Sequence, residues 1–234
     1  ISELFDPQGL TALINKLLTP LTNQIMARQG TVDKYMGDCI MAFWNAPLDD
    51  ENHARNGCLS ALAMLAEMDP LNERLEQEAK EEGRKHLDLK VGLGLNSGPC
   101  VVGNMGSDQR FDYSVLGDAV NLAARLEGQS GQYGVNIVLG EETAKQIPDL
   151  KLIELDLIAV KGKTEPVRIY TYLSDLHIDE VAKLKEAQDA MLKNYRLQNW
   201  DEAEQFLLTA RLMVPELEKY YQYFQERINQ FRIH

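Results

Sequence analysis

Two hydrophobic periodicities alternate along the first 173 residues, and this alternation limits the fold more than any other feature. Leucines and isoleucines recur every three or four positions over residues 10–25, which predicts an amphipathic helix. Short β-prone runs at 31–35 and 39–44 predict a hairpin, and strict alternation over 87–95 is typical of a half-buried strand. Interleaved helices and hairpins of this kind predict an α+β domain with helices on one face of a sheet.

The remaining elements are expected from shorter patterns. After a turn at 96–99, residues 100–103 are expected to return as a strand, followed by a loop. Helices and strands are then expected over these ranges: helices at 49–81, 118–127 and 141–147, and strands at 135–139, 150–160 and 167–173. The chain therefore carries several strands and helices before its character changes.

Beyond Ser174 the sequence contains no glycine and is compatible with helix almost throughout. Ala203, Ala210 and Pro215 have the spacing of a tetratricopeptide-like helical pair. We expect two domains, 1–173 and 174–234, the second a small all-helical tail. Because one such unit cannot bury its own apolar face, the tail is expected to pack on the preceding domain or on a partner.

Charge and cysteine content exclude several classes of protein. A formal net charge of −12 lacks the basic surface that nucleic-acid binding needs, so no nucleic-acid partner is expected. Three scattered cysteines favour a reducing, cytoplasmic location. No apolar run approaches the roughly 20 residues needed to span a bilayer, so no membrane contact is expected. The start at Ile1, without methionine, indicates a fragment of a larger protein, which is free to carry a membrane anchor.

The hairpin predicted at 31–44 has charged residues at its tip. Asp38 falls in the turn, and a carboxylate there can bind Mg²⁺, which prefers one or two carboxylates together with substrate phosphates. Lys34 lies four residues earlier on the incoming strand, so both side chains can face one ligand. The alternative is a solvated turn with surface charges.

A second polar pair lies on the helix predicted at 118–127. Asn121 and Arg125 are four residues apart, so they share one helix face. An amide and a guanidinium placed there can hold a ribose and a phosphate, and the alternative is a solvated helix face. Lys161, in the turn Lys161-Gly162-Lys163, adds a cation that is equally explained by solubility. The glycines of 92–98 have the wrong spacing for a dinucleotide-binding loop, and no Walker motif is present.

Taken in order, the Lys-x-x-Gly-Asp hairpin, the segment ending Val120-Asn121-Leu122-Ala123-Ala124-Arg125 and the Lys-Gly-Lys turn resemble the class III nucleotidyl cyclase catalytic domain. The resemblance covers roughly residues 1–173. It implies a ferredoxin-like α+β fold. It also implies an adenylate cyclase, which converts ATP to 3′,5′-cyclic AMP and pyrophosphate in signal transduction.

The resemblance also assigns roles to residues. Asp38 matches a metal-binding aspartate, and two Mg²⁺ (or Mn²⁺) ions per site are implied. Lys34 matches the lysine that reads the purine, and Ser114 stands at the second purine-reading position. The ribose-orienting and transition-state residues match Asn121 and Arg125. Lys161 and Lys90 match phosphate-binding cations of the family. Lys90 is equally explained as an outward-facing strand residue.

Members of the family work as head-to-tail dimers, so a homodimer with composite active sites is implied. The segment with the first metal aspartate is absent ahead of Ile1, either cut away or left out of the sequence. Guanylate cyclases typically have Glu where Lys34 stands, which favours ATP. Two alternatives stay open: a guanylate cyclase, and a catalytically silent cyclase-like module that regulates or binds other proteins.

Overall fold

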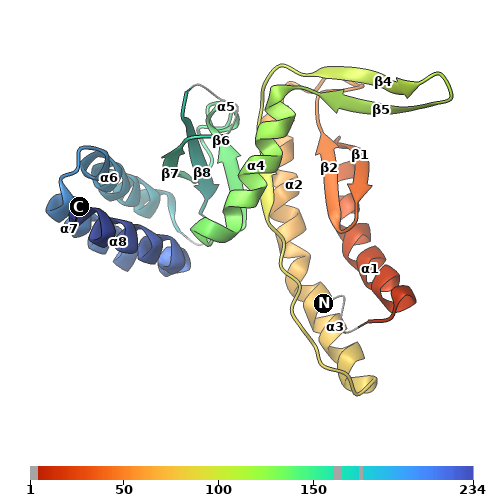
Figure 1. Cartoon of the computed structure of the whole chain (residues 1–234), viewed down its shortest axis with the longest axis horizontal. Helices are drawn as coiled ribbons and strands as arrows, with labels where there is room; N and C mark the ends of the chain where they lie inside the picture. The colour runs from red at the N-terminus through yellow and green to blue at the C-terminus, as the bar shows by residue number, and fades with distance from the viewer. Residues whose placement is uncertain (1–4, 161–164, 174–175, 234) are drawn as a thin grey trace. The chain divides into compact units, whose positions relative to one another are not determined.

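The computed structural model describes residues 5–160, 165–173 and 176–233. These residues form two compact units, of which the first comprises 1–91 with 99–120 and the second 92–98 with 121–234. The mixed α+β architecture that the sequence predicts is confirmed (Figure 1). Strand pairing among the described residues gives a four-stranded sheet and two separate two-stranded sheets, in place of the one sheet expected.

The first unit is built from helices and two hairpins. Its helices are α1 (Pro7–Met26), α2 (His53–Ala66) and α3 (Met68–Glu81). Asp6 caps α1 by accepting a hydrogen bond from the Gly9 amide at 2.7 Å, and the buried side chains of the helix include Leu17, Leu21 and Ile25. The expected hairpin consists of β1 (Thr31–Met36) and β2 (Cys39–Phe43), with Gly37 at φ +63° in the turn.

Two predictions for the first unit were wrong. The helix predicted at 49–81 is divided at Glu67, because Pro70 has no amide hydrogen to donate to the carbonyl of Ala66. The loop predicted after residue 103 is a hairpin of β4 (Val101–Ser107) and β5 (Arg110–Leu116), so the returning strand pairs with β5. The glycines and polar residues of β4 concealed this strand.

The second unit contains the four-stranded sheet in the order β3-β6-β8-β7. Its strands and helices are β3 (Leu93–Leu95), α4 (Asp118–Tyr133, from Asn121 on), β6 (Ile137–Gly140), α5 (Glu141–Ala144), β7 (Leu152–Ile158) and β8 (Val167–Tyr172). The prediction of a strand at 87–95 is therefore wrong for most of these residues, since only Leu93–Leu95 form one. The backbone of Leu89 instead pairs with the side-chain amide of Asn72, at 2.8 and 2.9 Å.

The tail completes the second unit with α6 (Ile178–Arg196), α7 (Trp200–Met213), the 3₁₀ turn η2 (Pro215–Leu217) and α8 (Glu218–Arg232). Its apolar side chains share one core with the sheet, including Leu155 and Ile169 from the strands and Met191, Tyr220 and Phe224 from the tail. The tail thus packs on the preceding domain, as the sequence predicts. The domain boundary after residue 173 stays a prediction. Among the described residues, no helix has the length and apolar character to cross a membrane.

Candidate active site

Lys34 on β1 and Ser114 on β5 meet at a third residue, Asp33. The Ser114 hydroxyl donates a hydrogen bond to Asp33 Oδ2 at 2.7 Å. The Lys34 ammonium lies 3.6 Å from Asp33 Oδ1, with its own side chain about half exposed. The structure therefore brings together the two predicted purine-reading residues, which are 80 positions apart, since 114 − 34 = 80.

A β-bulge directs the Asp33 side chain inward. Val32 pairs with Ala42 and Lys34 with Met41, so Asp33 is the extra residue on β1. Its side chain is fully buried, and Oδ1 has no hydrogen-bond donor within the described part of the chain. The sequence motifs do not identify Asp33, because adjacency to Lys34 is its only signal and the bulge has no sequence signature.

Asp38 occupies the turn between β1 and β2, as predicted, and is exposed. An exposed carboxylate on a tight turn has free oxygen ligands for a hard cation such as Mg²⁺, so the residue suits one side of a metal site. No cluster of three or more metal-ligating His, Cys, Asp or Glu residues occurs within 5–160, 165–173 and 176–233. A metal site that includes Asp38 would therefore need at least one further ligand beyond those that the described residues bring together.

Helix α4 carries the second predicted pair. Leu122 and Leu126 are buried in the core of the second unit, and Asn121 and Arg125 each precede one of them by a single position. Asn121 is exposed, whereas Arg125 is partly buried, and its Nη1 has no hydrogen-bond partner among the described residues. Buried polar atoms without a partner are few in native proteins and require an explanation. A guanidinium in this state is suited to an anionic ligand.

Close packing fixes the position of α4 on the sheet. A Cβ atom on Gly94 of β3 would lie 2.2 Å from the Ala123 carbonyl oxygen and 2.3 Å from the Glu127 amide nitrogen. Only glycine therefore allows the strand to approach α4 at this point. The glycine-rich segment at 92–98 thus has a packing role, in agreement with the rejection of a dinucleotide-binding loop.

Two predicted phosphate-binding lysines gain no support from the geometry. Lys161 lies outside the described residues. Lys90 is exposed, and it lies in an irregular segment and not on the strand where it was expected. The described site residues therefore form two sets. Lys34, Asp38 and Ser114 belong to the first unit, and Asn121 and Arg125 belong to the second.

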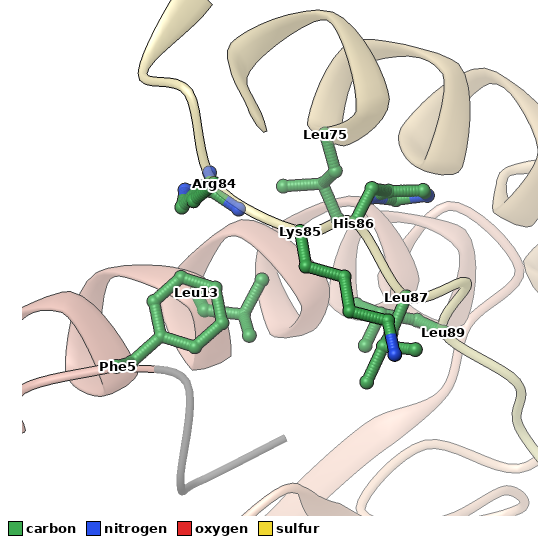
Figure 2. A pocket seen from close by; sticks show the side chains of 8 residues that line it. All are labelled: Phe5, Leu13, Leu75, Arg84, Lys85, His86, Leu87 and Leu89. Carbon is green, nitrogen blue, oxygen red and sulfur yellow. The ribbon is translucent and has the colours of Figure 1, made fainter. Parts of the chain in front are cut away.

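A small pocket in the first unit is lined by residues that were not predicted as site residues. Four leucines line it together with Phe5 and Arg84, whose guanidinium carbon lies 4.9 Å from the centre of the Phe5 ring (Figure 2). Asp33, Lys34, Asp38 and Ser114 are not among its lining residues. The pocket therefore reflects packing between α1, α3 and the segment at 84–89, and none of the predicted site residues lines it.

Curated relatives have the same domain. Adenylate cyclase 1 of Rhizobium meliloti (strain 1021) is 31% identical over 172 residues, which are 73% of this chain and 25% of that protein. The adenylate cyclase of Anabaena cylindrica is 32% identical over 175 residues, which are 73% of this chain and 33% of that protein. The match thus spans only a quarter to a third of these relatives.

Solved structures resemble the chain as well. The adenylyl cyclase CyaB from P. aeruginosa is 32% identical, with a TM-score of 0.65 over 75% of this chain and 88% of that one. The guanylyl cyclase Cya2 is 26% identical, with a TM-score of 0.62 over 76% of this chain and 87% of that one. Residues 1–174 match the family described as adenylate and guanylate cyclase catalytic domain. The chain belongs to this family of class III nucleotidyl cyclases.

Proposed function

We propose that this chain is the catalytic part of an adenylate cyclase, which converts ATP to 3′,5′-cyclic AMP and pyrophosphate. The observation that carries the proposal is the convergence of Lys34 and Ser114 on the buried carboxylate of Asp33. The ammonium of Lys34 suits N1 of adenine, which accepts hydrogen bonds. N1 of guanine carries a hydrogen and would face a cation. The relatives from Rhizobium meliloti and Anabaena cylindrica are both named adenylate cyclases.

In the proposed reaction, the ribose 3′-oxygen attacks the α-phosphorus. A bond forms between them, the bond from the α-phosphorus to pyrophosphate breaks, and the hydroxyl proton is released. Asn121 would hold the ribose through its amide. Arg125 would stabilise the negative charge that develops on the α-phosphate, because its Nη1, which has no hydrogen-bond partner among the described residues, gains hydrogen bonds there. Lys161 and Lys90 remain candidates for the triphosphate.

Asp38 is the proposed ligand of the divalent ions, two Mg²⁺ or Mn²⁺ per site, together with an aspartate from outside these residues. When bound, the ions would favour ionisation of the 3′-hydroxyl and neutralise charge on the phosphates. Asp38 contributes by presenting an exposed carboxylate at a turn that Gly37 permits.

We also propose that the active form is a homodimer with composite sites, in which the metal aspartates, including Asp38, come from one subunit. The other subunit contributes Lys34, Asn121, Arg125 and Lys161. Several large apolar side chains of the β4–β5 hairpin support an interface because they are exposed in the single chain: Val101 at 68%, Phe111 at 64% and Leu116 at 61%. The cytoplasmic location expected from the cysteines stays a prediction.

Turnover of ATP and GTP by the intact protein, with Mg²⁺ or Mn²⁺, tests the activity. Asp38→Ala and Arg125→Ala should each abolish turnover, and mixing the two proteins should restore part of it, because one mixed site carries both intact residues. Co-sedimentation would verify that the variants associate. If they associate and stay inactive, the composite site is wrong.

The two alternatives give different results in the same assays. A guanylate cyclase, as Cya2 is, would prefer GTP. A silent module would bind its partner and release no pyrophosphate from either nucleotide. The presence of Asp38, Asn121 and Arg125 disfavours the silent module, since such a module has no chemical need for this set.

A further inference from the structure

The hydrogen bond between Ser114 and Asp33 has a fixed direction. A carboxylate can only accept, so the single hydrogen of the Ser114 hydroxyl is donated to Asp33 Oδ2, at 2.7 Å. Ser114 is 6% exposed and the Asp33 side chain is fully buried, so water does not compete for this bond. The Ser114 oxygen is left with its lone pairs, and toward any further group it acts as an acceptor.

Adenine and guanine differ at the group that such an acceptor would meet. The six-position of adenine carries an amino group, which donates hydrogen bonds, whereas that of guanine carries a carbonyl oxygen, which accepts them. An acceptor facing the guanine oxygen would leave two buried acceptors opposite each other, and sites with this kind of mismatch discriminate strongly. A serine with a freely rotating hydroxyl would satisfy either purine.

We propose that Asp33 contributes to purine specificity, because it holds the Ser114 hydrogen and makes Ser114 a dedicated acceptor for the amino group of adenine. This inference rests on the proposed function, in which Lys34 and Ser114 contact the purine. Asp33 is a positioning residue, since it acts through these two side chains.

The geometry around Asp33 supports a role in selection. The bulge on β1 places the Asp33 carboxylate next to Ser114 of β5 and Lys34 of β1. The Ser114 hydroxyl bonds Oδ2, and the Lys34 ammonium lies 3.6 Å from Oδ1. Bulges near active sites commonly redirect one side chain. Because Oδ1 has no hydrogen-bond donor in the described residues, packing alone does not explain why a carboxylate is buried here.

The test compares ATP with GTP in Asp33→Asn protein. The asparagine amide can donate to the Ser114 oxygen, which frees the hydroxyl hydrogen for the guanine carbonyl. The preference for ATP, measured as the ratio of kcat/KM values, should fall by about tenfold, the effect of one exchanged buried hydrogen bond. Asp69→Asn, which changes an exposed carboxylate on α3, is the matched control and should leave the ratio unchanged.

A double-mutant cycle separates positioning from a general structural role. In a Ser114→Ala background, Asp33→Asn should change the ATP preference by less than about twofold, because the hydroxyl through which Asp33 acts is gone. The proposal is overturned if Asp33→Asn lowers ATP and GTP turnover equally, or if its effect on the ratio is the same without Ser114.

Binding of 3′-deoxy-ATP and 3′-deoxy-GTP, which cannot cyclise, gives a second readout. If the unmodified protein makes neither cyclic nucleotide, the proposed function fails, and the affinity ratio still decides the role of Asp33. If Asp33→Asn does not fold, Ser114→Ala should lower the adenine preference and Ser114→Thr, which keeps the hydroxyl, should retain it. A threonine variant that behaves like alanine would overturn the proposal.

Discussion

Strands β1 and β7 each contain a bulge, and the polar atoms around the two bulges differ in how completely they are hydrogen-bonded. At Asp33 on β1, one carboxylate oxygen is buried and accepts no hydrogen bond from the described part of the chain. At the β7 bulge between Glu154 and Asp156, side chains of the tail bind the backbone carbonyls. Gln188 donates to the Glu154 carbonyl at 2.8 Å, and Tyr220 donates to the Leu155 carbonyl at 2.6 Å.

The carboxylate of Asp156 is equally well bound. Its Oδ2 accepts hydrogen bonds from Arg227 at 2.7 Å and from the Tyr133 hydroxyl at 2.8 Å, and its Oδ1 accepts from the Leu157 amide at 2.8 Å. The Arg227 guanidinium also lies about 5.0 Å from the Tyr195 ring centre. The β7 bulge is thus an anchor for the tail, whereas the β1 bulge keeps a polar atom available. A fully paired buried network rigidifies the structure around it, whereas an unpaired buried atom requires an explanation, which for Asp33 is the proposed role in purine selection.

The largest effect on stability is expected at the β7 anchor. Asp156→Ala removes the partner of the partly buried Arg227 and should lower the free energy of unfolding by about 3–5 kcal/mol, as for other broken buried ion pairs. Urea unfolding would measure the loss. Glu186→Ala, on the exposed face of α6, should change it by less than about 0.5 kcal/mol. Equal effects of the two variants would remove the contrast between anchor and surface.

Alkaline pH should weaken the same anchor. Burial raises the pKa of Tyr220 well above its usual value, with the charges of Tyr221 and Asp156 adding to the effect. Burial likewise raises the pKa of Tyr221 and Tyr133. The stabilisation is fully present below the unfolded pKa near 10 and is lost as pH rises toward the folded values.

The expected decline above pH 10 is about 1.4 kcal/mol per pH unit for each such tyrosine. Unfolding in urea between pH 8.5 and 11 would measure this slope. Tyr220→Phe should reduce the slope by about 1.4 kcal/mol per pH unit, because phenylalanine cannot ionise. An unchanged slope would show that Tyr220 does not contribute.

A smaller effect, on specificity and not on folding, is expected at the β1 bulge. Lys34→Glu should lower the ratio of ATP to GTP turnover by about tenfold, or about 1.4 kcal/mol, since an acceptor then faces N1 of adenine. Its side chain is 47% exposed, so the unfolding midpoint should move little. If the ratio does not change, purine selection lies elsewhere.

The smallest effect on stability is expected at the hairpin turn. Asp38→Ala should change the free energy of unfolding by less than about 0.5 kcal/mol, because Asp38 is exposed, while metal-dependent turnover is lost. Thermal unfolding and ATP turnover of the same preparation would measure both quantities. A large drop in the unfolding midpoint would instead identify Asp38 as a structural residue, and the contrast with Asp156 would disappear.

Prediction from sequence succeeded where the signal is local. The helix at 10–25 and the hairpin around Gly37 follow from side-chain period and turn chemistry, which act over a few residues. It failed where a strand has weak propensity, as in β4, because its glycines and polar residues are typical of a loop. It also failed at 87–92, where a side-chain amide on α3 takes the place of a neighbouring strand.

For the candidate site, the sequence by itself determined which chemical groups are present and on which elements Lys34, Asp38, Asn121 and Arg125 lie. Only the tertiary structure decided that Asp33 stands between Lys34 and Ser114, and that the tail completes the β7 bulge. The physical reason is that hydrogen-bond partners far apart in sequence are chosen by packing. A bulge changes the direction of one side chain without changing the pattern of apolar residues around it.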